Sequence, residues 1–196
     1  MARSKSNTAD LLVDAAEKHF AERGYDASSL NDIAAEVGIR TPSLYSHFKN
    51  KQALYEAVFQ RRLKPLFTLF EDHGVFPEDA DQARELFREV MGQLLRHPNL
   101  ARLMQYAVLA GGDSVEVLMA QVYRPLVKML EASIADLPEQ QRRERRLLFA
   151  EFHSMIFGFF TFGPVYTELL GQSTEDEDVA RDHLEFLESL IGSVGN

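Results

Sequence analysis

The side chains best suited to recognising another molecule lie in a window without carboxylates, from Val37 to Tyr55. The charged groups in this window are cationic and belong to Arg40, Lys49 and Lys51. Smaller polar and aromatic groups lie among them, on Ser43, Tyr45, Ser46 and His47. Small hydroxyls fit against base edges, while Lys, Tyr and His side chains reach phosphate oxygens. The window therefore predicts a helix that enters a DNA groove.

Residue types needed for catalysis or metal binding are missing or badly spaced. The sequence contains no Cys, which excludes disulfides, thiolate metal sites and a cysteine nucleophile. Gly111-Gly112 lacks the preceding strand and the following Lys of a phosphate-binding loop. No two of the six histidines stand three or four positions apart: His19, His47, His73, His97, His153 and His183. We expect no enzyme activity, no cofactor and no metal.

Two short helices joined by a tight turn must position this window. Ser29, with Asp32 three positions later, has the spacing of a helix cap, and Ile33, Ala34 and Val37 then form one apolar stripe. Gly38 follows where the backbone needs a positive φ angle.

The second helix is expected to start with Thr41 as its N-cap and Pro42 at its first position. Leu44 and Phe48 stand four positions apart and face inward, so Pro42 and the serines face outward. The pattern indicates a helix-turn-helix.

The run GYDASSLNDIAAEVGIRTPSLYSHFKNKQAL, about the first quarter of the chain, resembles the DNA-binding signature of the TetR family of bacterial transcriptional repressors. It matches the small-hydroxyl, I-A, V-G, L-Y-x-H-F and N-K-x-x-L positions without a gap. The alternative is an ordinary helical hairpin whose Tyr45 and Phe48 belong to the core.

The resemblance implies two sets of DNA contacts. The major-groove set is Arg40, Thr41, Ser43, Tyr45 and His47. The phosphate-binding set is Ser29, Asn31 and Lys51. We expect Arg40 to contact a guanine base, because a guanidinium matches the paired acceptors of guanine.

The whole chain is expected to be all-α, with a TetR-like architecture of nine helices and no strand. A helix-turn-helix DNA-binding domain over 1–51 precedes an effector-binding and dimerisation domain over 52–196. Pro65 predicts a kink or an early break, Pro125 a bend, and Pro164 allows a flexible break. The expected helices cover about 7–23, 29–37, 42–48, 51–72, 78–96, 100–110, 113–135, 138–170 and 175–194.

The distribution of charge and hydropathy along the chain indicates how the protein contacts DNA and in which compartment it is expected. The net charge is −9, yet residues 1–51 hold seven basic and seven acidic residues, so all the excess acid lies after them. DNA contact should therefore be local and weakened by salt. The absence of Cys and of an apolar leader favours the cytoplasm. The apolar stretch from Leu147 to Leu170 contains Glu151, His153 and Glu168, so we expect a buried helix and no membrane span.

The last two helices carry more apolar surface than one subunit can cover. The resemblance implies a homodimer formed by these helices on double-stranded operator DNA. The expected interface residues are Phe157, Phe160, Leu184, Leu187, Leu190 and Ile191. A deeper core within one subunit is the alternative explanation.

Aromatic and Met side chains are frequent between Phe87 and Tyr166. They could line an apolar cavity, with Gln121 as a polar group that orients a ligand, or simply fill a core: Phe87, Met91, Met104, Tyr106, Phe152, Met155, Phe159 and Tyr166. The resemblance implies a cavity for a small effector, here a hydrophobic or aromatic compound or an acyl chain. We predict a ligand-responsive repressor; regulation by a protein partner, or activation, without a small effector is the alternative.

Overall fold

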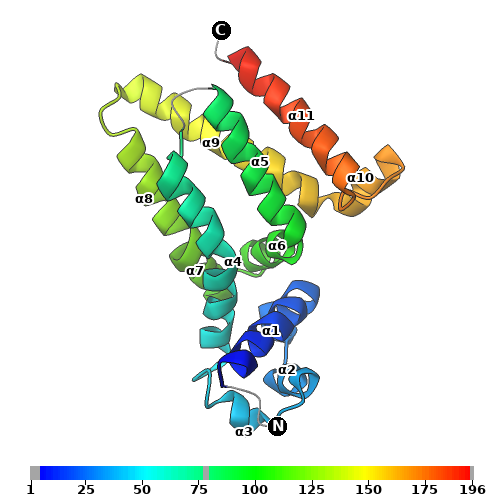
Figure 1. Cartoon of the computed structure of the whole chain (residues 1–196). Helices are drawn as coiled ribbons and strands as arrows, with labels where there is room; N and C mark the ends of the chain where they lie inside the picture. The colour runs from blue at the N-terminus through cyan, green and yellow to red at the C-terminus, as the bar shows by residue number, and fades with distance from the viewer. Residues whose placement is uncertain (1–4, 77–79, 195–196) are drawn as a thin grey trace. The chain divides into compact units, whose positions relative to one another are not determined.

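The computed structural model describes residues 5–76 and 80–194, and every regular element in these two ranges is helical (Figure 1). The predicted all-α class is confirmed. Contacts within the chain define two compact units. Unit 1 contains residues 1–63 and 102–124, and unit 2 contains residues 64–101 and 125–196. The functional division at 51/52 stays a prediction.

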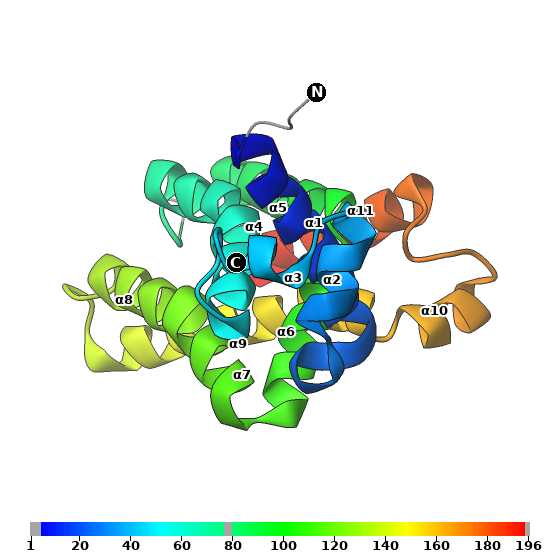
Figure 2. The ribbon, with the colours of Figure 1, turned by 90° about the horizontal axis from the view of Figure 1, so that it is seen from below.

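Unit 1 is built around three N-terminal helices, which lie together in both ribbon views (Figure 1 and Figure 2). It also contains the first part of α4 and the end of α6. Its elements are α1 (Lys5–Ala27), α2 (Leu30–Val37), α3 (Thr41–Leu44), α4 (Lys51–His73), α6 (Asn99–Ala110), α7 (Gly112–Leu118) and the π-helix η1 (Met119–Tyr123).

An aromatic and aliphatic core holds these helices together. The Tyr55 ring of α4 lies 4.9 Å from the Phe20 ring of α1 and 5.0 Å from the Phe59 ring. Both contacts are edge-to-face, an arrangement that aromatic quadrupoles favour. Ile33 of α2 and Leu44 of α3 are fully buried in the same unit. The predicted inward face of the helix-turn-helix is therefore present.

An ion-pair network also ties α4 to α1. The Arg62 Nε donates to Glu17 Oε2 at 2.6 Å, and Arg61 Nη2 lies 3.1 Å from Asp14 Oδ1. Glu17 is only 4% exposed, and burial raises its pKa in spite of the Arg62 cation. The network fixes the first half of α4 to the three-helix core rather than leaving it as a free connector.

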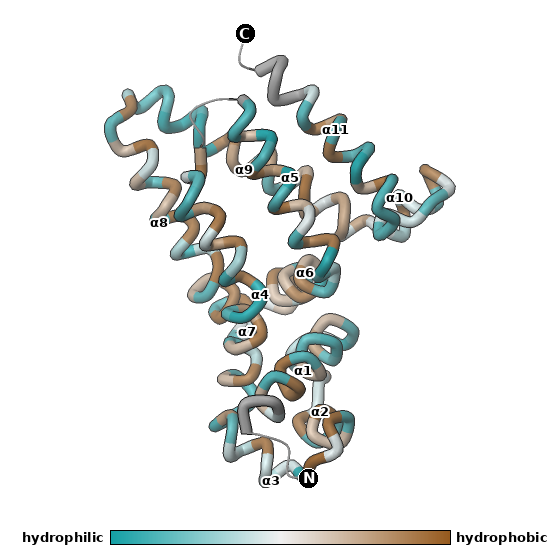
Figure 3. Tube along the Cα trace, in the orientation of Figure 1, coloured by the Kyte–Doolittle hydropathy of each residue, from teal (hydrophilic) through white to brown (hydrophobic). Residues whose placement is uncertain are grey.

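Unit 2 contains the rest of α4 and the first residues of α6. Within this unit α5 and α11 lie side by side (Figure 1). Hydrophilic and hydrophobic residues alternate along both helices, as amphipathic helices require (Figure 3). The other elements are α5 (Ala80–Arg96), α8 (Arg124–Ser133), α9 (Glu139–Thr161), α10 (Gly163–Leu170) and α11 (Glu177–Val194).

The expected single helix from Pro138 to Leu170 is wrong. It is broken at Phe162 into α9 and α10, which meet at an angle of 76°. Pro164 cannot donate the next helical hydrogen bond, and it serves instead in the first turn of α10. Gly163 fits closely there, because an added Cβ would lie 2.8 Å from Thr174 Oγ1 and one of the two groups would have to shift.

The other prolines have different outcomes. The helix α4 continues through Pro65 to His73, so an early break is wrong, whereas the kink stays a prediction. The boundary between units 1 and 2 falls at Leu63/Lys64, next to this proline. The expected helix over 113–135 is present as α7, η1 and α8, with a π turn just before Pro125.

Within the described ranges, no individual helix has the length and hydropathy to cross a membrane. The bent pair α9 and α10 reaches that threshold only when its two helices are taken together.

Candidate nucleic-acid interface

The first predicted contact residues lie where α2 begins. Ser29 is the N-cap of α2, as predicted, with an extended backbone and its Oγ accepting from the Asn31 amide nitrogen at 3.2 Å. This bond satisfies one of the amides that a helix start leaves unpaired. The cap places Ser29 and Asn31 together at the positive end of the α2 dipole, where an anion is favoured.

The turn after α2 brings α3 to a defined position. Gly38 adopts a φ of 77°, and the amides of Gly38 and Ile39 donate to Ala35 and Ala34 at 3.0 and 2.9 Å. This pair of bonds is the Schellman arrangement that closes a helix. The predicted turn at Gly38 is confirmed.

The expected cap of α3 is wrong by one residue. The N-cap of α3 is Arg40, and the Thr41 Oγ1 donates instead to Asn31 Oδ1 at 2.7 Å. Pro42 occupies the first turn, as predicted. Leu44 is fully buried, which anchors the short helix to the core of unit 1.

The outer side of α3 is polar and cationic. Arg40, Ser43 and Tyr45 are exposed, Tyr45 by 52%, while His47 is half-buried. The Ser46 Oγ donates to the Ser43 carbonyl at 2.7 Å. Because Tyr45 is exposed, its ring and hydroxyl are available for an external contact.

Lys51, at the start of α4, is held close to the turn between α1 and α2. Its Nζ donates to the Asp26 carbonyl at 3.1 Å and lies 4.6 Å from the centre of the Tyr25 ring. Burial lowers the Lys51 pKa. An ammonium group has three protons, so the group is oriented and still able to donate to a phosphate. Sequence reasoning missed Tyr25, although its place beside the Gly24 turn was visible.

A second feature that sequence reasoning missed is the neutralisation of Glu36. The Glu36 Oε2 lies 2.9 Å from His19 Nε2, and its Oε1 accepts from Lys18 Nζ at 3.2 Å. The hydrogen bonds from His19 and then Lys18 lower the Glu36 pKa. The last carboxylate before the acid-free window is therefore paired with groups of α1.

All eight predicted DNA-binding residues lie in unit 1, on α2, on α3 and its following turn, or at the start of α4. Their contacts with DNA stay a prediction. The arrangement offers hydroxyl, amide, guanidinium and ammonium donors on a rigid helical scaffold, which is the donor set that phosphates and base edges accept.

The predicted effector residues do not all come together. Met104, Tyr106 and Gln121 belong to unit 1, where the Tyr106 hydroxyl donates to the Glu22 carbonyl at 3.4 Å and Gln121 bonds Gln60. The other six belong to unit 2, where the Phe87 and Phe152 rings are 4.8 Å apart. Met91, Met104 and Phe159 are at most 4% exposed. Their role in ligand binding stays a prediction.

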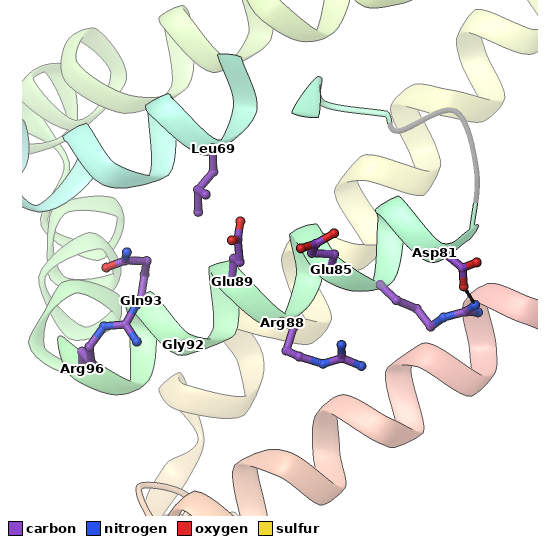
Figure 4. Close-up of a pocket in the computed structure, with 9 residues that line it drawn as sticks. Leu69, Asp81, Glu85, Arg88, Glu89, Gly92, Gln93 and Arg96 are labelled. Atoms are coloured by element: carbon purple, nitrogen blue, oxygen red, sulfur yellow. Dashed lines mark hydrogen bonds and ion pairs between the residues drawn. The ribbon is translucent and has the colours of Figure 1, made fainter. Parts of the chain in front are cut away.

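A groove of about 790 Å³ lies on unit 2 and differs in character from the expected apolar cavity. None of the nine predicted effector residues lines it. Figure 4 shows Glu85 and Glu89 on the side of α5 that faces Leu69 of α4, with Arg88 on the other side. Arg88 donates to Glu188 of α11 at 2.8 Å. The groove residues are Leu69, Asp81, Arg84, Glu85, Arg88, Glu89, Gly92, Gln93 and Arg96.

The predicted interface residues differ in exposure. Phe160, Leu184 and Leu187 are already covered by their own chain, and Phe157 stacks on His153 at 4.5 Å. The side chains of Leu190 and Ile191 lie outside the described residues. Among the described side chains of α10, α11 and the bend before α10, the large apolar ones that are exposed are Phe162, Val165, Leu169, Leu170 and Phe186. The interface itself stays a prediction.

Comparison with known proteins identifies the N-terminal segment. Residues 12–58 match the family described as "Bacterial regulatory proteins, tetR family". The chain is 47% identical over 47 residues to the biofilm operon icaADBC HTH-type negative transcriptional regulator IcaR of Staphylococcus aureus, and 41% identical over 59 residues to the HTH-type transcriptional repressor ComR of Escherichia coli. These matches cover 24% and 30% of this chain, and 25% and 28% of the relatives.

Solved structures resemble the chain over nearly its whole length. The fatty acid degradation regulator FadR from Bacillus halodurans has a TM-score of 0.64 at 17% identity, covering 95% of this chain and 97% of that one. A TetR-like transcriptional regulator from Rhodococcus sp. RHA1 has a TM-score of 0.65 at 22% identity, covering 100% of both chains. At these identities the likeness is one of fold.

Proposed function

We propose that this chain, which carries the TetR-family DNA-binding domain over residues 12–58, is a cytoplasmic transcriptional repressor that binds palindromic operator DNA as a homodimer. The observation that carries the proposal is the outward side of α3. Arg40, Ser43 and Tyr45 are exposed there, while Leu44 anchors the helix in the core. A short rigid helix with donors outside and no carboxylate suits the major groove.

Two-fold symmetry follows from this assignment. A dimer presents two copies of α3, and both enter the major groove when they are separated by about one DNA turn, ~34 Å, or a multiple of it. The exposed apolar side chains of α10, α11 and the bend before α10 support a subunit contact, because a second subunit would remove their apolar surface from water. They include Phe162, Val165, Leu169, Leu170 and Phe186.

Selection of duplexes from a random pool tests DNA binding directly. The full-length protein should retain one palindromic sequence, and its affinity should fall steeply as the salt concentration rises. Ser43→Glu places a carboxylate on the outer side of α3 and should abolish retention. Ser133→Glu adds the same charge to an exposed serine of unit 2 and should leave retention unchanged. Equal loss in both variants would contradict the role of α3.

The second part of the proposal is that a small effector controls operator binding. A ligand that binds unit 2 better in the state with low DNA affinity must weaken operator binding, by about 5- to 150-fold for ordinary coupling energies. The expected ligand is hydrophobic or aromatic, and candidate contacts are Phe87, Phe152 and Met155. The charged α5 groove is a separate place for a polar ligand.

A panel of fatty acids, aromatic compounds and charged metabolites, screened by thermal shift, would separate these sites. Phe152→Ala should remove stabilisation by an apolar compound, whereas Arg96→Ala should remove stabilisation by an anionic one. A compound that binds tightly and leaves operator affinity unchanged would count against effector control.

A second candidate function is DNA binding controlled by a protein partner, or activation, without a small effector. The observation that favours it is the packing of Met91, Met104 and Phe159, which are buried by their own chain. Failure of the whole panel to shift the melting temperature, together with retained operator binding, would favour this candidate.

A further inference from the structure

The start of α2 and the start of α3 are joined by one side-chain hydrogen bond. The Thr41 Oγ1 donates to the Asn31 Oδ1 at 2.7 Å, across ten positions of sequence. Asn31 is exposed and Thr41 is half-buried, so the bond lies at the edge of the surface assigned to DNA. Both residues are expected from the sequence to contact DNA, but this hydrogen bond gives them different roles.

The division follows from the number of protons each group can donate. A threonine hydroxyl has one proton, and here it is used on Asn31. Phosphate oxygens only accept hydrogen bonds, so Thr41 cannot donate to a phosphate while this bond holds. The Asn31 amide oxygen accepts this bond, which orients the side chain, and its NH₂ group keeps two donors. No hydrogen bond from this NH₂ group occurs among the described residues.

Ser46 and Ser29 differ in whether the hydroxyl proton is already used in a hydrogen bond. The Ser46 Oγ donates its proton to the Ser43 carbonyl at 2.7 Å and so resembles Thr41. The Ser29 Oγ accepts from the Asn31 amide nitrogen and therefore keeps its own proton. Of the Thr41, Ser46 and Ser29 hydroxyls, the Ser29 hydroxyl can donate to a phosphate without first breaking a bond.

We propose that Thr41 is a positioning residue, which orients Asn31 so that the Asn31 NH₂ group donates to a backbone phosphate. This inference rests on the proposed function and assigns the donor at that surface. The same bond holds the N-terminus of α3 against α2. A helix of four residues, Thr41–Leu44, whose N-cap Arg40 makes no side-chain cap bond, has little stability of its own.

A double-mutant cycle tests the assignment with the full-length protein and a duplex selected by the wild type. Thr41→Val keeps the shape and removes the hydroxyl, Asn31→Ala removes the amide, and the third variant carries both changes. Thr41→Val should weaken binding about fivefold in the wild-type background, the loss expected for one hydrogen bond, and by less than about twofold when Asn31 is already Ala. Thr41→Ser keeps the hydroxyl and should bind like the wild type.

Two further readouts separate positioning from direct contact and from misfolding. Because Thr41 touches no base in this assignment, Thr41→Val should leave the base preference of the selected pool unchanged. Melting followed by circular dichroism should show the wild type and all four variants folded at the assay temperature. An equal loss from Thr41→Val in both backgrounds, or an altered base preference, would overturn the proposal. A wild-type protein that retains no duplex at low salt would instead overturn the proposed function and this inference with it.

Discussion

At the scale of single residues, the outer side of α3 separates side chains by the kind of hydrogen bond they can make. Arg40 has five fixed N–H donors and is exposed, whereas Tyr45 has one hydroxyl on a large ring. A guanidinium can bond two acceptors of one guanine, but a single hydroxyl on a ring is better suited to a phosphate. The two residues should therefore affect DNA binding differently.

Arg40→Ala should relax the preference at one base position and weaken binding to the selected operator by about 1 to 3 kcal/mol. Tyr45→Ala should weaken binding to all sequences alike, because a phosphate carries no base identity. Both effects are measured by competition between the selected duplex and its single-base variants. If Arg40→Ala lowered affinity uniformly, Arg40 would not read a base.

At the scale of elements, α2 depends on its glycine end and on its ion pair with α1. Gly38 has a φ of 77°, and an added Cβ would meet no atom within 4 Å. The cost of Gly38→Ala is therefore backbone strain alone, about 1 kcal/mol.

Gly158 lies inside α9 and also has open space around it, so Gly158→Ala should stabilise by about 0.5 to 1 kcal/mol. Urea unfolding of both variants measures the change in the free energy of unfolding, which should be negative for Gly38→Ala and positive for Gly158→Ala.

The pairing of Glu36 with His19 and Lys18 makes α2 sensitive to acid. The folded pKa of Glu36 lies below its ordinary value of 4.5, so the pair contributes stability above pH 4.5. That contribution is lost as the pH falls through the folded pKa. Glu36→Gln should lower the free energy of unfolding at pH 7 and have less effect at pH 3.

Denaturant titrations at the two pH values test this prediction. Glu71→Gln, on an exposed carboxylate of α4, is the control and should change stability little at either pH. An effect of Glu36→Gln that is the same at both pH values would show that the ion pair is not its source.

At the scale of the whole molecule, assembly decides whether one α3 or two can meet the DNA. Leu169 of α10 and Leu109 of α6 are almost equally exposed, by 75% and 76%. In the proposed dimer Leu169 lies at the subunit contact and Leu109 does not. The two leucines therefore form a matched pair for testing assembly.

Leu169→Glu should shift the protein from dimer to monomer, because a carboxylate would be buried without a partner, and operator binding should fall with it. Leu109→Glu should change neither. Sedimentation velocity measures the mass and a gel-shift assay measures binding. A protein that is monomeric before any substitution, or a dimer that tolerates Leu169→Glu, would contradict this interface.

The structure of the helix-turn-helix could be predicted from the sequence alone, because the interactions that form it are local. The Ser29 cap, the Gly38 turn and the inward Leu44 depend on residues a few positions apart. Their spacing predicted the helix-turn-helix, and the same run carries the resemblance to the TetR family. The break before Pro164 also had a local signal, the Gly163-Pro164 pair, although the surrounding apolar residues favoured a continuous helix.

Tertiary structure alone decided which distant groups meet. Thr41 donates to Asn31 instead of capping its helix, Glu36 pairs with His19, and Arg62 reaches Glu17. The Met and aromatic residues of one sequence stretch are divided between two compact units. A hydroxyl, carboxylate or ring has many possible partners along a sequence, and only the packing of helices brings one of them within bonding distance.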